Sequence, residues 1–179
     1  MSDEVQIEAY DPAWPALYLD EARRLGSVFR GGTLLTMEHI GSTAVPGLAA
    51  KPVIDLMGLV KSLDAARQSL IAPIEALGYA YWADNPAPDR MFFVRGLPPA
   101  PCRTHHLHLV ERPSELRRHL VFRDELRRDP ELLLAYAELK WRLAKEHKGD
   151  REAYTSAKKA FIDQAIAKAP RHLSSDSVI

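Results

Sequence analysis

The almost uninterrupted apolar run from Pro52 to Val60 constrains the fold of this chain more than any other segment. Such a run is typical of a strand that is covered on both faces and therefore lies in the interior of a sheet. Asp55 is the only ionisable residue in it, and a buried carboxylate is unfavourable unless it is paired, hydrogen-bonded or bound to a metal. The run therefore predicts an interior strand that presents Asp55 to a metal or, alternatively, a structural aspartate bonded to backbone amides.

The loop before this strand has the residues of a phosphate-binding turn. Gly41 allows close approach of the backbone to an anion, and the hydroxyl groups of Ser42 and Thr43 can donate to phosphate oxygens. Gly47 adds a second permissive backbone position, and Lys51 adds a positive charge where the loop ends. The alternative is an ordinary Gly-Ser-Thr turn, but the adjoining Asp55 favours a loop that holds phosphates next to a metal-binding strand.

The remaining periodicity predicts an α+β fold, in which a mixed sheet is packed with helices and the C-terminal helices trail the strands. Strands are expected at 33–40, 52–60, 79–84, 91–97 and 105–111, and helices at 12–29, 65–77, 114–129, 130–147 and 151–169. Asp11, Asp64 and Asp150 are the expected N-caps, and Pro73 is expected to interrupt its helix. We expect a single domain over residues 1–170 and a disordered tail over 171–179.

The composition is that of a globular protein, with 46% hydrophobic and 27% charged residues. The single cysteine, Cys102, forms no intrachain disulfide, and the acidic, polar N-terminus does not resemble a secretion signal. No apolar run approaches the ~20 residues of a membrane helix. These features predict a cytoplasmic protein that binds no membrane. Residues 1–90 contain 7 Lys/Arg and 12 Asp/Glu, whereas residues 91–179 contain 17 and 12, so the second half is the expected location of an anion site.

Several motifs, in this order, resemble the GrpB family of bacterial proteins. They are YDPAWP from Tyr10, EHIGSTAVPGLAAKPVIDLMG from Glu38, HHLHLVE from His105, HLVFRDELR from His119, YAELKWRLA from Tyr136 and DREAYTSAKKAFI from Asp150. The resemblance spans roughly Ile7 to Ala167. It implies a nucleotidyltransferase-like fold related to DNA polymerase beta and to antibiotic nucleotidyltransferases. A similar domain is also appended to bacterial dephospho-coenzyme A kinases, where it resembles an accessory or folding module.

The sequence departs from the wider nucleotidyltransferase pattern at the metal-binding carboxylates. That pattern has two acidic residues separated by one, but Met57 occupies the second position, and histidines occupy the region of the third. His106 and His108 lie two residues apart on a predicted strand and therefore face the same side. With Asp55 they would form a two-histidine, one-carboxylate site for a divalent metal, which suits Mn²⁺, Fe²⁺ or Zn²⁺ better than Mg²⁺. The alternative is one buried, hydrogen-bonded histidine and one histidine at the sheet surface.

The trailing helices add candidate phosphate ligands. Arg123, Lys140 and Lys158 lie in the family-like motifs and can neutralise phosphate charge, and Tyr154 can stack on a base or donate a hydrogen bond. For each of them the alternative is a surface charge or a tyrosine at the edge of the core. Aromatic and basic residues do not alternate as they do in a nucleic-acid stacking surface, so we expect no nucleic-acid partner.

Two functions are consistent with these residues. In the first, an enzyme binds a nucleoside triphosphate and a divalent metal (Mg²⁺, Mn²⁺ or Zn²⁺) and transfers a nucleotidyl group to a small-molecule acceptor, with Asp55, Glu38 and His106 as candidate catalytic residues. Strand alternation lets only one of Glu38 and His39 face the site. In the second, the chain is a non-catalytic module that binds a nucleotide or metabolite or assists folding. Met57 favours the second function, whereas Asp55 with two co-facing histidines favours the first.

Overall fold

The computed structural model describes residues 5–85, 87–97, 100 and 102–170. The helices are α1 (Trp14–Gly26), α2 (Leu63–Ser69), α3 (Ile71–Ala76), α4 (Pro113–Arg128), α5 (Pro130–Glu146), α6 (Arg151–Ala157) and α7 (Lys159–Lys168), with a 3-10 turn, η1 (Ser42–Ala44). The strands are β1 (Leu34–Ile40), β2 (Ile54–Val60), β3 (Tyr79–Tyr81), β4 (Arg90–Arg95) and β5 (His105–Val110).

The strands form one mixed sheet in the order β1-β2-β5-β4-β3. β2 pairs antiparallel with β1 and parallel with β5, while β4 pairs antiparallel with both β5 and β3. The prediction of an α+β fold with a mixed sheet and trailing helices is therefore confirmed. The apolar run around Asp55 forms an interior strand, as its composition predicts.

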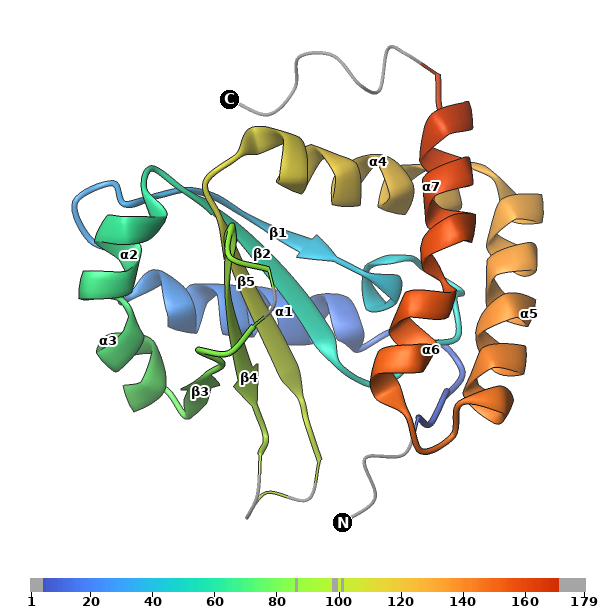
Figure 1. Ribbon diagram of the computed structural model, residues 1–179, viewed down its shortest axis with the longest axis horizontal. Coiled ribbons are helices and arrows are strands. Elements are labelled where there is room, and N and C mark those ends of the chain that lie inside the picture. The colour runs from blue at the N-terminus through green and yellow to red at the C-terminus, as the bar shows by residue number, and fades with distance from the viewer. Residues whose placement is uncertain (1–4, 86, 98–99, 101, 171–179) are drawn as a thin grey trace.

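Helices cover both faces of the sheet (Figure 1). One face packs against α1, α2 and α3, and its core includes Trp14, Leu25, Leu63 and Ile74 with inward residues of β2, β4 and β5. On the other face, Leu116 and Leu120 of α4 pack on Ile40, Met57, Leu59 and Val110. In Figure 1, α5, α6 and α7 gather at the opposite end of the molecule from α2 and α3. The second face of β2 and β5 therefore lies between α4 and this helical end.

Four local predictions were wrong in detail. Ser62 rather than Asp64 caps α2, because the Ser62 side chain accepts a hydrogen bond from the Ala65 N–H. The predicted helix over 151–169 is broken at Lys158 into α6 and α7, and the strand predicted over 79–84 ends at Tyr81. The helix predicted from Pro12, with Asp11 as its N-cap, begins at Trp14, and Asp11 accepts from the Ala13 N–H in the preceding turn.

Other local predictions were confirmed. Asp150 caps α6 by accepting hydrogen bonds from the N–H groups of Glu152 and Ala153. The helix containing Pro73 is interrupted at Leu70, which separates α2 from α3. Among the described residues, no helix combines the length and apolar composition needed to cross a lipid bilayer. The tail predicted over 171–179 lies outside the described residues, and the single-domain prediction over 1–170 stays a prediction.

Candidate functional site

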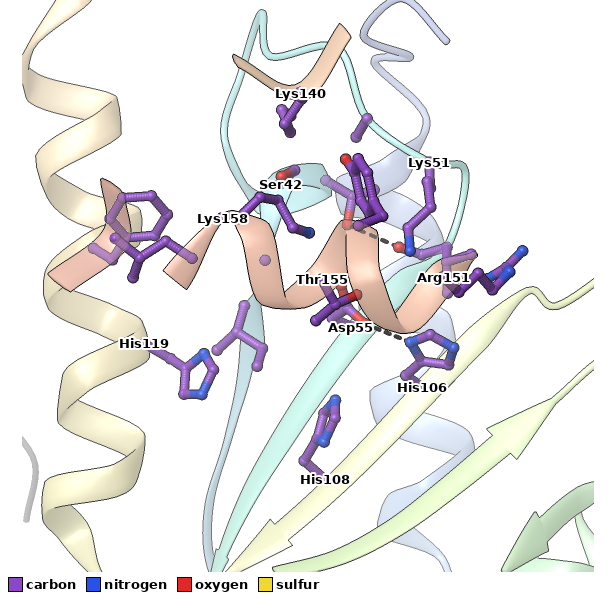
Figure 2. Close-up of a pocket in the computed structure, with 18 of the residues that line it drawn as sticks. Ser42, Lys51, Asp55, His106, His108, His119, Lys140, Arg151, Thr155 and Lys158 are labelled. Atoms are coloured by element: carbon purple, nitrogen blue, oxygen red, sulfur yellow. Dashed lines mark hydrogen bonds and ion pairs between the residues drawn. The ribbon is translucent and has the colours of Figure 1, made fainter. Parts of the chain in front are cut away.

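A cavity of about 620 Å³ opens where β2, β5 and β4 meet the loop around η1 and helices α4, α5 and α6. Figure 2 shows Asp55, His106 and His108 on the strands that form one side, with Lys140, Lys158 and Ser42 on the other side of Asp55. Among the described residues that line it, eight are Lys or Arg and two are acidic: Lys51, Arg90, Arg103, Arg118, Arg123, Lys140, Arg151 and Lys158 against Asp55 and Glu152. This excess of positive charge favours an anionic ligand.

The parallel pairing of β2 and β5 brings the candidate metal ligands together. Asp55 lies opposite His106 and Met57 opposite His108, so the Asp55, His106 and His108 side chains share one face of the sheet. One potential ligand atom from each of them lies within 4.8 Å of the others. His106 Nε2 and His108 Nδ1 are buried and have no hydrogen-bond partner among the described residues. Two imidazole nitrogens and a carboxylate are a donor set that fits a transition-metal ion.

A hydrogen bond fixes the orientation of the His106 ring. Burial opposes ionisation of Asp55, but the hydrogen bond from His106 and the nearby positive charges lower the pKa of Asp55 to about 2. The ionised carboxylate only accepts hydrogen bonds, so His106 Nδ1, 2.9 Å from Asp55 Oδ1, carries the hydrogen. In the neutral ring, Nε2 then keeps its lone pair for a metal or a proton.

The loop around η1 approaches Asp55 closely. Gly41 has φ +72° and ψ −172°, and a Cβ atom there would lie 2.5 Å from Asp55 Oδ2. The Ser42 hydroxyl forms a hydrogen bond with the Tyr136 side chain. The Thr43 hydroxyl is 3.0 Å from His39 Nε2 and donates weakly to the Val53 carbonyl at 3.4 Å. Gly41, Ser42 and Thr43 all line the cavity, but the hydroxyl groups of Ser42 and Thr43 are hydrogen-bonded to other protein groups.

The lysines form the cationic end of the cavity. Lys140 is 1% exposed and donates to the Ala49 carbonyl, and burial and the charge of Lys158 lower the pKa of Lys140 to about 7. Burial and the charge of Lys51 likewise lower the pKa of Lys158 to about 7. The Lys158 Nζ atom lies 4.2 Å and the Lys51 Nζ atom 5.1 Å from the centre of the Tyr154 ring. Near neutral pH, a bound anion would hold both low-pKa lysines in their charged forms.

Glu38 and His39 point to opposite faces of β1. The His39 ring stacks on Tyr18 of α1 at 4.7 Å, whereas Glu38 accepts from Arg123 of α4 at 3.2 Å. Arg123 also bonds Asp124 and the His39 carbonyl, so its guanidinium is held by protein groups although it lines the cavity. Glu38, which strand alternation puts on the side of Asp55, is not among the cavity-lining residues.

Residues 4–168 match the family model described as GrpB protein. The chain belongs to the GrpB family.

This GrpB chain is 42% identical over 168 residues to a UPF0157 protein of Pseudomonas aeruginosa, an alignment that covers 93% of this chain and 68% of the relative. The crystal structure of the conserved protein GrpB from Enterococcus faecalis is similar at a TM-score of 0.84 and 34% identity, covering 95% of this chain and all of that chain. A dephospho-CoA kinase of Mycolicibacterium paratuberculosis is 31% identical over 188 residues, which cover 92% of this chain and 46% of the kinase. The family resemblance and the appended GrpB-like region of such kinases are thus confirmed.

Several residues of the GrpB cavity were missed by the sequence analysis. His119 begins a family-like motif on α4 and lines the cavity, where burial and Arg90 lower its pKa to about 4. Trp82 and Asn85 follow β3, and Phe92 lies on β4, which the sequence marks only as a short apolar strand. The order of strands in the sheet determines that these residues share one cavity with Asp55, and local sequence patterns contain little information about that order.

Proposed function

We propose that this GrpB chain binds a nucleoside triphosphate and a divalent cation in the cavity and transfers the nucleotidyl group to a small-molecule acceptor. The observation that carries the proposal is that candidate metal ligands and a group of lysines lie in the same cavity. Asp55, His106 and His108 form one cluster. In the same cavity, Lys51 and Lys158 lie over the Tyr154 ring and Lys140 lies over the Tyr136 ring. Metal ligands beside a cationic pocket are what a phosphate chain with a bound cation requires.

The lysines and the glycine loop are assigned to the phosphates. Gly41 and Ser42 line the cavity, so the Gly41 backbone is assigned to the phosphates, and the Ser42 hydroxyl would exchange its bond to Tyr136 for one to a phosphate oxygen. Binding of the phosphates raises the pKa of Lys140 and of Lys158 and draws a proton onto each Nζ atom. Two ammonium groups then offset the charge of the pyrophosphate portion.

Asp55, His106 and His108 are assigned to the cation. Two imidazole nitrogen atoms and the ionised carboxylate match the donor set of Mn²⁺ or Zn²⁺ better than that of Mg²⁺. A cation held there would polarise a phosphoryl oxygen of the substrate. With Asp55 Oδ1 hydrogen-bonded to His106 Nδ1, the Nε2 atom points away from the carboxylate, so a cation bound by both residues would replace this hydrogen bond.

In the proposed transfer, an acceptor oxygen or nitrogen forms a bond to the α-phosphorus while the bond from that phosphorus to the pyrophosphate oxygen breaks. The pyrophosphate leaves with both bonding electrons, and the acceptor loses its proton to water at the cavity mouth. The chain contributes by positioning the two reactants and by neutralising the leaving group with Lys140 and Lys158. Glu38 has no part in this scheme, because Arg123 binds its carboxylate.

A second candidate function is binding without turnover, and one observation favours it. Met57 is 1% exposed and packs in the core between the sheet and α4. The position that holds a second carboxylate in the nucleotidyltransferase pattern is therefore a hydrophobic core position. The chain would then be a module that binds a nucleotide or metabolite without converting it. Such a role would also suit the GrpB-like region of the kinase relative.

Calorimetric titration of the purified protein with each of ATP, GTP, CTP and UTP, with and without Mn²⁺, tests the proposal. We expect Mn²⁺-dependent binding that weakens at least tenfold in Asp55→Asn and in the double variant Lys140→Met/Lys158→Met. Asp64→Asn and Lys145→Met are matched controls, because both residues are exposed and neither lines the cavity. Absence of triphosphate binding, or equal binding by variants and wild type, would refute the proposed site.

Pyrophosphate release separates the two candidate functions. Wild-type protein is incubated with the bound triphosphate, Mn²⁺ and a panel of small hydroxyl and amine compounds. Release that is lost in Asp55→Asn supports nucleotidyl transfer. Tight binding without release under any of these conditions supports the binding module.

A further inference from the structure

The cavity has an aromatic end that the metal ligands and the lysines do not use. Phe92 of β4 stacks beside His108 with ring centres 4.7 Å apart, and Trp82 lies beside Phe92 at 5.8 Å. The backbone N–H of Trp82 donates to the Phe92 carbonyl, which extends the β3–β4 pairing by one residue. A continuous row of side chains therefore runs across the sheet from Asp55 through the histidines to Phe92 and Trp82.

The aromatic end is open to solvent. Trp82 is 40% exposed, and α4 packs against β1, β2 and β5 on the other side of the row. Three strand spacings of about 4.8 Å separate β2 from the segment that follows β3. That span suits a ligand with a planar apolar group at one end and a phosphate chain at the other, rather than a single inorganic phosphate.

Tyr154, which the sequence suggests as a stacking residue, is not available for this role. It is 1% exposed, and the Lys158 ammonium lies over its ring, with Lys51 nearby. An incoming base would have to displace these cations. Cations also lie near the other two rings, with Arg103 at 5.8 Å from Trp82 and Arg90 at 6.0 Å from Phe92. Trp82 differs from Tyr154 in its exposure, because at 40% it is the most exposed of the described aromatic residues that line the cavity.

Asn85 supplies a polar group at the same end. Its Oδ1 atom accepts from the Ala87 N–H at 3.0 Å, which fixes the orientation of the side-chain amide because the backbone N–H only donates. Its Nδ2 atom is buried and has no hydrogen-bond partner among the described residues. A buried donor without a partner is unfavourable, and an acceptor on a ligand would satisfy it.

We propose that Trp82 and Phe92 form a nucleobase subsite, in which the base packs against the two rings and an acceptor on its edge binds Asn85 Nδ2. This inference rests on the proposed function, because it assigns the base of the nucleotide whose phosphates the lysines bind. Aromatic side chains pack well on planar groups, and this packing does not distinguish strongly between different bases. The single oriented donor of Asn85 selects bases with an acceptor on the edge that reaches it.

The test compares nucleotides with tripolyphosphate, which has the phosphates but no base, in the presence of Mn²⁺. In wild-type protein the preferred nucleoside triphosphate should bind at least about tenfold more tightly than tripolyphosphate, in line with base–aromatic contacts. Trp82→Ala should remove this difference and leave tripolyphosphate binding unchanged. Trp141→Ala is the matched control, because Trp141 is 51% exposed on α5 and does not line the cavity. Equal binding of both ligands to the wild type, or an unchanged difference in Trp82→Ala, would overturn the subsite without affecting the phosphate site.

A second experiment, with nucleosides that have no phosphate, tests the subsite even if no triphosphate binds. Adenosine, guanosine, cytidine and uridine are titrated while the tryptophan fluorescence is followed. Quenching that saturates in wild type and in Trp141→Ala, and is lost in Trp82→Ala, supports the subsite even if the phosphate site fails. Absence of saturable quenching by any nucleoside, together with no triphosphate binding, overturns it. Asn85→Asp, which keeps the acceptor for Ala87 but removes the donor, should change the order of preference among the four bases.

Discussion

His106 Nδ1 lies 2.9 Å from Asp55 Oδ1, across the parallel pair of β2 and β5. The bond joins the one carboxylate in an apolar interior strand to a histidine on the neighbouring strand. It helps to keep Asp55 ionised although that side chain is only 28% exposed. The pair is therefore both a structural solution for a partly buried charge and the centre of the candidate metal site.

Asp55→Asn should weaken metal binding by at least roughly 10- to 100-fold, the range found when a group that orients a metal-binding histidine is lost. Asparagine keeps the shape of the side chain but removes its charge, so the His106 ring loses its ionic partner. Titration with Mn²⁺, followed by electron paramagnetic resonance of the free ion, measures the affinity directly. Asp64→Asn, at an aspartate whose side chain is 89% exposed, should bind as the wild type does. Equal affinities for all three proteins would show that Asp55 holds no metal.

Gly41→Ala should lower the free energy of unfolding by at least about 2 kcal/mol, because its φ and ψ are accessible essentially only to glycine. The added methyl group would also lie 2.5 Å from Asp55 Oδ2 and would displace the carboxylate. Urea denaturation of three variants separates these effects. Gly47→Ala has a positive φ but no neighbour within 4 Å, and Gly149→Ala has neither problem. If Gly41→Ala were no less stable than Gly149→Ala, the close approach of the loop to Asp55 would be wrong.

Lys140→Met should flatten the pH dependence of stability between pH 7 and about 10.4. The pKa of Lys140 is about 7 in the folded protein, against about 10.4 for an unperturbed lysine, so the unfolded chain binds more protons in this window. The free energy of unfolding of the wild type therefore rises with pH there, by up to about 1.4 kcal/mol per pH unit from this residue. The contribution is lost as the pH falls toward 7, where the buried lysine becomes charged.

Urea denaturation at several pH values measures this slope in the wild type, Lys140→Met and Lys145→Met. Lys145 lies on the same helix but is exposed, so its substitution should leave the slope unchanged. Equal slopes for the wild type and Lys140→Met would mean that Lys140 has an ordinary pKa. The proposed uptake of a proton on phosphate binding would then fail for this residue.

Strand periodicity was enough to predict which residues of the site share a face. The alternation of HHLHLV predicts that His106 and His108 point the same way, and the apolar run around Asp55 predicts an interior strand. That these two strands lie next to each other in the sheet could be predicted only from the family resemblance. A parallel pair of strands about fifty residues apart leaves no pattern in the local sequence. Likewise, the alternation of side chains along β1 predicts that Glu38 and His39 point to opposite faces of the sheet. Only the packing of Tyr18 on His39 shows which of the two faces α1.

The roles of single side chains were harder to predict where tertiary contacts occupy them. Tyr154 has an aromatic ring that could stack on a base, yet two lysines lie over that ring. Arg123 lies in the cavity wall as expected, but Glu38, Asp124 and the His39 carbonyl hold its guanidinium. Trp82 follows a three-residue strand, and its proximity to the histidines depends on the β5-β4-β3 order of the sheet. Such contacts join distant segments, so a local pattern does not reveal them.

Met57→Asp tests whether the missing second carboxylate can simply be restored. Met57 is 1% exposed among Ile40, Leu59, Val110, Leu116 and Leu120, so an aspartate there would be buried in an apolar core. We expect the free energy of unfolding to fall by about 3 kcal/mol or more, because an unpaired buried charge is poorly solvated. Met57→Leu, which roughly conserves volume, should cost less than about 1.5 kcal/mol. Both values come from urea denaturation, with Mn²⁺ stoichiometry measured in parallel. A Met57→Asp protein that is as stable as Met57→Leu and binds a second Mn²⁺ would instead show that this position can join the metal site.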